Sequence, residues 1–134
     1  GSNERGRFKN FIFNFDAAAG IDYNVYVRKP NGQKVNILRM SNGKPFEENK
    51  WYNVAINSYR GNGGGQLLTL GAGIPHDSLR SRIVWRSQRD QRYYFMKAIE
   101  EMGTVDPQPN HNWKFIPEAW VKEAGERDAK LIFK

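Results

Sequence analysis

Cysteine is absent from this chain of 134 residues, and histidine occurs only twice. Without cysteine, disulfides, thiolate metal sites and thiol nucleophiles are all excluded. The two histidines, His76 and His111, fall in no HxH, DxH or HExxH pattern, so a catalytic metal would have too few ligands here. A GxSxG elbow and a Walker A sequence are also missing, which removes two further common signatures of hydrolytic and phosphate-binding sites.

Long hydrophobic runs are absent as well. No apolar stretch approaches the roughly 18 residues of a membrane span, and no signal peptide is visible. The opening Gly1-Ser2 resembles a cleavage scar, so the lack of a signal carries no information about secretion. Acidic residues are outnumbered by basic ones, which gives a net charge of +7. Such a surface is simply solvated, or it suits an anionic ligand, a nucleic acid or an acidic partner.

The first sixty residues carry the period-two alternation of strands. We expect strands over 8–15, 21–27, 34–40 and 51–59, with the Asn31-Gly32 pair forming a hairpin turn between the second and third. A hydrophobic content of 39% is enough for a packed core, and the length predicts one domain.

Helical spacing follows. It predicts helices over 75–85 and 87–103, the second with Ser87 as N-cap and Gly103 in the left-handed position after its end. Its apolar stripe is expected in the core and comprises Tyr94, Phe95, Ala98, Ile99 and Met102. Short strands are expected over 113–117 and 130–134. This order predicts an α+β fold, with a mixed or antiparallel sheet packed with two helices.

The segment Gly61–Gln66, "GNGGGQ", is the most unusual stretch of the chain. Tyr59 precedes it at the expected strand end, where its ring can stack on a nucleobase for about 1–3 kcal/mol. Arg60 can pair with a phosphate or a carboxylate, and the glycines allow a flat ligand to approach the backbone. Two other interpretations remain open: the glycines form a turn with positive φ, and Tyr59 is a core or edge residue.

A basic run follows the glycines and contains Arg80, Arg82, Arg86, Arg89 and Arg92. It is interpreted as a solvated helix face, with nucleic-acid binding as the alternative. Asp77 and Asp90 interrupt the run, and no RRM, KH or helix-turn-helix signature accompanies it. We therefore do not expect nucleic acid as a partner.

The stretch "WYNVAINSYRGNGGG" resembles the C-terminal domain of the 5′-nucleotidase family, and within it the 2′,3′-cyclic-nucleotide 2′-phosphodiesterase/3′-nucleotidase branch. The matching positions are Tyr52, Val54, Ala55, Asn57, Tyr59, Arg60, Gly63, Gly64 and Gly65. "FNFDAAAGIDYNVYVRKP", "NGKPFEENKWY" and "NWKFIP" are similar to further family segments in the same order, so that the resemblance covers roughly residues 11–118.

The resemblance implies a 5′-nucleotidase C-terminal-domain-like fold, with residues 1–134 forming a single domain or a fragment of the substrate-binding domain. It also implies a periplasmic or cell-surface enzyme whose separate metallophosphatase domain, in the same chain or another, holds divalent metal ions. The family's base-stacking ring falls on Tyr59, and Asn57 and Gly63–Gly65 fall at the base or ribose edge. With Arg60, these form the expected substrate-binding set, with no catalytic residue, metal ligand or cofactor in this chain.

Two departures from the family pattern stand out. The 5′-nucleotidase type often carries an Asp where this chain has Gly65. The family's second base-stacking aromatic, and the first half of its domain, lie upstream of the matching segments and are missing here. We therefore expect a nucleoside- or nucleotide-binding domain that does not hydrolyse its ligand alone. The alternatives are a stand-alone nucleotide-binding protein and a basic nucleic-acid-binding domain.

Overall fold

The computed structural model describes residues 14–133, which form two units. One unit runs up to Lys50 and resumes at Asn110, and the other comprises Trp51–Pro109. The strand expected over 8–15 lies almost wholly outside the described residues, and Phe15 itself is in no strand. Among residues 14–133, no helix has the length and apolar character needed to cross a membrane.

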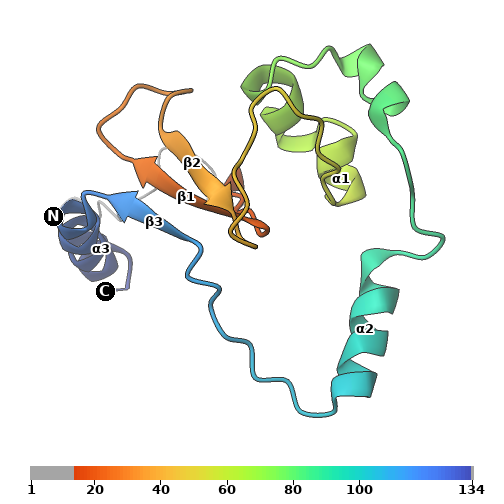
Figure 1. Ribbon diagram of the computed structural model, residues 1–134. Coiled ribbons are helices and arrows are strands. Elements are labelled where there is room, and N and C mark those ends of the chain that lie inside the picture. Colours follow the sequence, from red (N-terminus) through yellow and green to blue (C-terminus); the bar gives the residue numbers. More distant parts are fainter. Residues whose placement is uncertain (1–13, 134) are drawn as a thin grey trace, which may run out of the picture. The chain divides into compact units, whose positions relative to one another are not determined.

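The first unit contains a mixed sheet with the strand order β2-β1-β3 (Figure 1). Strand β1 (Ile21–Tyr26) pairs antiparallel with β2 (Val35–Met40) and parallel with β3 (Trp113–Ile116). The strands expected over 21–27, 34–40 and 113–117 are thus confirmed, and Asn31-Gly32 lies in the turn between β1 and β2. Sheet and helices together make an α+β fold, as the sequence predicted.

Aromatic rings gather around β1 and β3. Tyr23, which is 7% exposed, stacks on Trp113 with ring centroids 5.9 Å apart. Trp113 also meets Phe115 edge to face at 5.1 Å and Phe15 at 5.9 Å. The Tyr23 hydroxyl accepts a hydrogen bond from the Ala18 amide at 3.1 Å. The small core of this unit therefore forms where two strands distant in sequence bring their rings together.

Side-chain interactions join the outer strand β2 to β1 in addition to the backbone hydrogen bonds. Arg39 Nε donates to Asp22 Oδ2 at 2.7 Å, and Ser41 Oγ donates to Asp22 Oδ1 at 2.8 Å. These two hydrogen bonds, that from Arg39 first, hold the pKa of Asp22 below its ordinary range.

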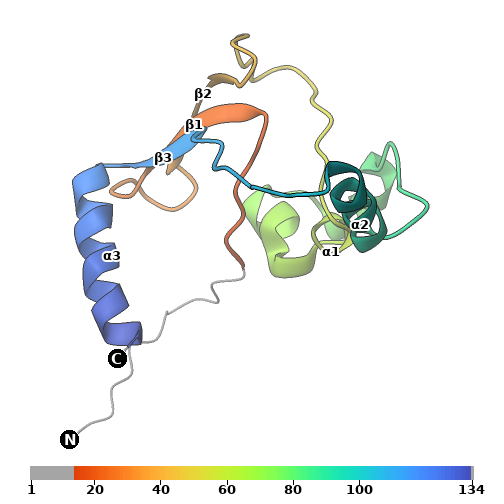
Figure 2. The same cartoon turned by 90° about the horizontal axis from the view of Figure 1, so that it is seen from below.

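Helix α3 (Glu118–Ile132) follows β3 and turns away from the line of that strand (Figure 2). The Arg28 guanidinium, at the β1–β2 turn, lies 3.8 Å from the Trp120 ring centroid in the first part of α3. This cation–π contact joins helix and sheet. The strand expected over 130–134 is wrong. Helix α3 continues through Ile132, so the backbone of these residues forms helical hydrogen bonds and not those of a sheet.

In the second unit, the strand expected over 51–59 is wrong. Among the described residues, no strand pairs with 51–57, so the alternating residues lie outside any sheet. Asn57 then caps a one-turn helix, α1 (Ser58–Gly61). Alternation of apolar and polar residues shows which side chains would share a face of a strand. A strand forms only if a neighbouring strand supplies hydrogen bonds for its backbone N–H and C=O groups.

The helix expected over 75–85 is wrong. Two short 3-10 turns form instead, η4 (His76–Ser78) and η5 (Arg80–Arg82). The helical backbone ends at Ile83, which is extended at φ −80°, ψ 113°. Helix α2 (Gln91–Met102) is confirmed, but it begins later than expected. Its N-cap is Asp90, whose Oδ1 accepts from the Tyr93 amide at 3.0 Å, and Ser87 is not the cap. Gly103 is the C-cap and has a positive φ of 71°, but its ψ of −88° is not the left-handed conformation that was expected.

The apolar stripe of α2 does not form a core. Phe95 is 65% exposed, Met102 is 67% exposed and Tyr94 is 46% exposed. Within the Trp51–Pro109 unit, no other helix packs broadly against this stripe. Leu79, at 6% exposed, is instead the buried apolar residue of this unit.

Candidate functional site

The glycine loop begins at helix α1, which Asn57 holds in place. Asn57 has extended backbone angles, and its side-chain Oδ1 accepts a hydrogen bond from the Arg60 amide at 2.9 Å. This is the N-cap arrangement that asparagine favours. The cap fixes the turn that presents Tyr59, so the structure gives Asn57 a local role in the backbone.

Tyr59 lies on α1 and not at a strand end, and it is 57% exposed. One edge of its ring rests on the glycine loop. A Cβ atom built on Gly64 would lie 2.6 Å from the Cδ2, Cε2 and carbonyl oxygen atoms of Tyr59. Only glycine leaves room for the ring at this point. Gly64 thus sets the position of the Tyr59 ring, while most of that ring stays accessible.

Arg60 is buried, at 8% exposed. Its Nη1 donates to the Gly64 carbonyl at 3.2 Å, and its guanidinium carbon lies 5.4 Å from the Tyr59 ring centroid. The side chain therefore links the helix, the ring and the glycine loop. The expectation that Arg60 pairs with a phosphate stays a prediction, and the contacts seen are those of a loop support.

Gly63 is the second glycine that packing requires. Its φ is +88°, the left-handed region that favours glycine. A Cβ there would also approach His76 Cδ2 and Leu79 Cδ1 to 3.2 Å. The structure thus brings η4 against the glycine loop. Sequence reasoning missed this, because His76 stood alone in the sequence and no spacing rule connects it to Gly63.

The loop ends in two further residues of positive φ, Gly65 at 71° and Gln66 at 60°. The interpretation of this segment as a turn with positive φ is therefore confirmed for Gly63 and Gly65. The six expected site residues lie together within nine consecutive positions, and Asn57, Tyr59, Arg60 and Gly64 are further joined by direct contacts.

The site combines an exposed aromatic face with a backbone held in one shape. Such a face can stack on a flat ring. Among residues 14–133, no group of three or more His, Asp or Glu side chains is placed to hold a metal ion.

The chain was compared with known proteins. The family model of the 5′-nucleotidase C-terminal domain matches residues 3–71, a range that includes all six expected site residues. The trifunctional nucleotide phosphoesterase protein YfkN of Bacillus subtilis is 34% identical over 116 residues, covering 78% of this chain and 7% of the relative. No solved structure matches.

Two further relatives carry the same printed name, 2′,3′-cyclic-nucleotide 2′-phosphodiesterase/3′-nucleotidase. The protein of Haemophilus influenzae is 27% identical and that of Salmonella typhimurium 28% identical, each over 120 residues. Both alignments cover 78% of this chain and 17% of the relative. The chain thus spans less than a fifth of the length of these relatives.

Proposed function

Since the chain belongs to the family of 5′-nucleotidase C-terminal domains, we propose that it binds a nucleoside or nucleotide by stacking the base on Tyr59. The proposal rests on the position of the Tyr59 ring. The ring is 57% exposed, yet its edge is fixed against the backbone of Gly64. A ring that is held in place before the ligand arrives loses little conformational freedom on binding.

The surrounding residues have supporting roles in this proposal. Asn57 caps the turn that carries Tyr59, and Arg60 ties that turn to the Gly64 carbonyl. Gly63 and Gly65 turn the backbone beside them. Because Arg60 is only 8% exposed, we assign it to holding the loop, and we place the ligand's phosphate away from it.

Any hydrolysis belongs, in this proposal, to a metallophosphatase domain in the same chain or another, with divalent metal ions that the described residues here are not arranged to bind. The much greater length of the relatives leaves room for further domains. This chain would bind and orient the substrate, and orientation alone lowers the barrier of the reaction that another domain carries out. A periplasmic or cell-surface location is part of the same proposal.

Calorimetric titration of adenosine into the 134-residue chain tests the stacking role. Loss of one stacked base costs about 1–3 kcal/mol, so Tyr59→Ala should weaken binding about 5- to 150-fold. Tyr59→Phe keeps the aromatic face and should bind within about twofold of the wild type. Equal affinity of wild type and Tyr59→Ala, with unchanged circular dichroism, would show that the base does not stack there.

A separate assay tests whether this chain hydrolyses a nucleotide by itself. The chain is incubated with Mn²⁺ and 3′-AMP or 2′,3′-cyclic AMP, and phosphate or 3′-AMP release is measured. We expect no turnover above a sample without protein. Turnover that survives repeated purification and disappears with added chelator would contradict a purely binding role.

A further inference from the structure

A second surface of the Trp51–Pro109 unit has no part in the Tyr59 site. It is the arginine segment, residues 80–92, which includes η5, the connection 83–90 and the start of α2. All of its arginines are exposed: Arg80, Arg82, Arg86, Arg89 and Arg92. Its single acidic residue is Asp90. The segment therefore concentrates positive charge within a short stretch.

Within the part of the chain that the structure describes, no carboxylate neutralises these charges. Among residues 14–133, none of the five arginines forms a salt bridge with a carboxylate. Asp90 is occupied as the N-cap of α2, accepting from the Tyr93 amide, and Asp77 accepts from Ser78 Oγ at 3.4 Å. The two carboxylates that interrupt the basic run in the sequence thus do not pair with it.

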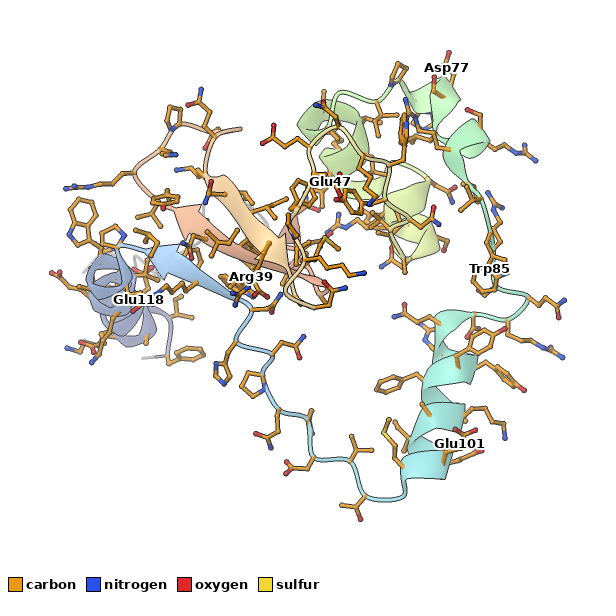
Figure 3. The ribbon with its side chains drawn as sticks, in the orientation of Figure 1. Arg39, Glu47, Asp77, Trp85, Glu101 and Glu118 are labelled. Atoms are coloured by element: carbon orange, nitrogen blue, oxygen red, sulfur yellow. The ribbon has the colours of Figure 1, made fainter. Side chains whose placement is uncertain are left out.

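Three exposed aromatic rings accompany the arginines: Trp85 within the segment, Tyr93 directly after it and Trp51 near Arg82. Trp85 is 75% exposed and lies on the connection that leads into α2 (Figure 3). Tyr93 is 45% exposed, and the Arg89 guanidinium lies 5.7 Å from its ring centroid. The Arg82 guanidinium lies 6.0 Å from the ring centroid of Trp51, which is 88% exposed. Two of the arginines, Arg82 and Arg89, thus each lie beside an exposed aromatic ring.

Although the sequence did not lead us to expect nucleic acid as a partner, we propose that the arginine segment binds single-stranded nucleic acid, with the arginines on the phosphates and with Trp85 and the adjacent Tyr93 on the bases. Exposed rings beside arginines that have no carboxylate partner among the described residues suit sequence-tolerant single-strand binding, because every base has a face that stacks. An acidic peptide would engage the arginines but would leave the rings without a flat partner. This binding goes beyond the nucleoside site and depends on different residues.

The first test is fluorescence anisotropy of a labelled oligo(dT) of about 12 nucleotides, within the range of single-strand sites. Affinity should fall steeply as salt rises from about 50 to 200 mM, since each neutralised phosphate releases counterions. Binding that is absent at low salt, or that does not respond to salt, would overturn the proposal.

The second test locates the surface. A triple variant with Arg86→Ala, Arg89→Ala and Arg92→Ala should bind at least about tenfold more weakly at low salt, and its logarithmic salt slope should be smaller by about 2. The control triple variant, Lys122→Ala, Arg127→Ala and Lys130→Ala, removes the same charge from exposed positions of α3. It should bind within about threefold of the wild type. If both triple variants lose the same affinity for oligo(dT), binding depends only on net charge, and the proposal is overturned.

The third test separates nucleic acid from other polyanions. Trp85→Ala should weaken oligonucleotide binding about fivefold or more, and Trp85→Phe should restore most of it. If Trp85→Ala has no effect, or if an oligo-glutamate peptide of equal charge displaces the oligonucleotide equally well, the partner is not a nucleic acid. The arginine triple variant should still bind adenosine as the wild type does, and Tyr59→Ala should still bind oligo(dT). Failure of one site is thereby distinguishable from failure of the other.

Discussion

Replacing Gly64 with alanine tests whether the glycine loop positions the Tyr59 ring. The added Cβ would lie 2.6 Å from two ring carbons and from the carbonyl oxygen of Tyr59, well inside the 3.4 Å at which ordinary contact begins. The ring can rotate away, but the carbonyl belongs to α1 and can move only with the helix. The substitution must therefore shift both the ring and the backbone that carries it.

The size of the effect follows from the cost of one extra methyl group in a space that cannot hold it. Forced displacement of this kind typically costs about 1–3 kcal/mol. Gly61→Ala is the matched control, because a Cβ there would meet only Ile56 Cδ1 at 3.8 Å and Ile56 Cγ1 at 4.0 Å. At such an unstrained position alanine stabilises by about 0.4–1 kcal/mol, through the unfolded state. The two variants should move stability in opposite directions.

Urea unfolding followed by circular dichroism measures the stability difference, and titration with adenosine measures its consequence for binding. Gly64→Ala should unfold at lower urea concentration and bind adenosine more weakly, because the ring is no longer where the base meets it. Gly61→Ala should retain the affinity of the wild type. If Gly64→Ala matches Gly61→Ala in both measurements, the contact between Gly64 and Tyr59 does not determine the site.

Two further predictions concern the supports of the fold. Asn57→Ala removes the cap of α1 and should cost about 0.5–2 kcal/mol locally, seen as faster hydrogen exchange of the Arg60 amide, whereas Asn57→Ser should retain protection. For Asp22, the pKa is lowered by Arg39 and Ser41, so its stabilising effect is present above its unfolded pKa of about 3.9 and is lost as the pH falls through the folded value. Asp22→Asn should therefore lower the melting temperature near neutral pH, and the difference from the wild type should shrink as the pH falls below about 3.9. A difference that does not shrink in acid would contradict the assignment.

The roles of the glycines changed most between sequence and structure. From the sequence, they were expected to make room for a ligand beside Tyr59. In the structure, Gly64 makes room for the Tyr59 ring itself, and Gly63 makes room for His76 and Leu79. The loop is therefore a close-packed support for the ring, and its glycines are required before any ligand is present.

Strand prediction was correct for two segments that are neighbours in the chain and pair with each other. The alternation in 21–27 and 34–40, with Asn31-Gly32 between them, encodes a hairpin whose strands are neighbours in the chain. The alternation in 51–59 looked equally good but has no partner strand among the described residues. A local pattern cannot show whether a partner exists, so alternation predicted strands correctly in 21–27 and 34–40 and wrongly in 51–59.

The sequence by itself determined the α+β class, the hairpin, helix α2 and the family, because each depends on residues close together or on motifs kept in order. Only the tertiary structure decided that Arg60 is buried and that His76 packs on Gly63. It also decided that the five arginines of segment 80–92 are exposed and have no carboxylate partner among residues 14–133. These facts depend on which atoms meet through space. Contacts of that kind arise only when the chain has turned back on itself, and no spacing along the sequence records them.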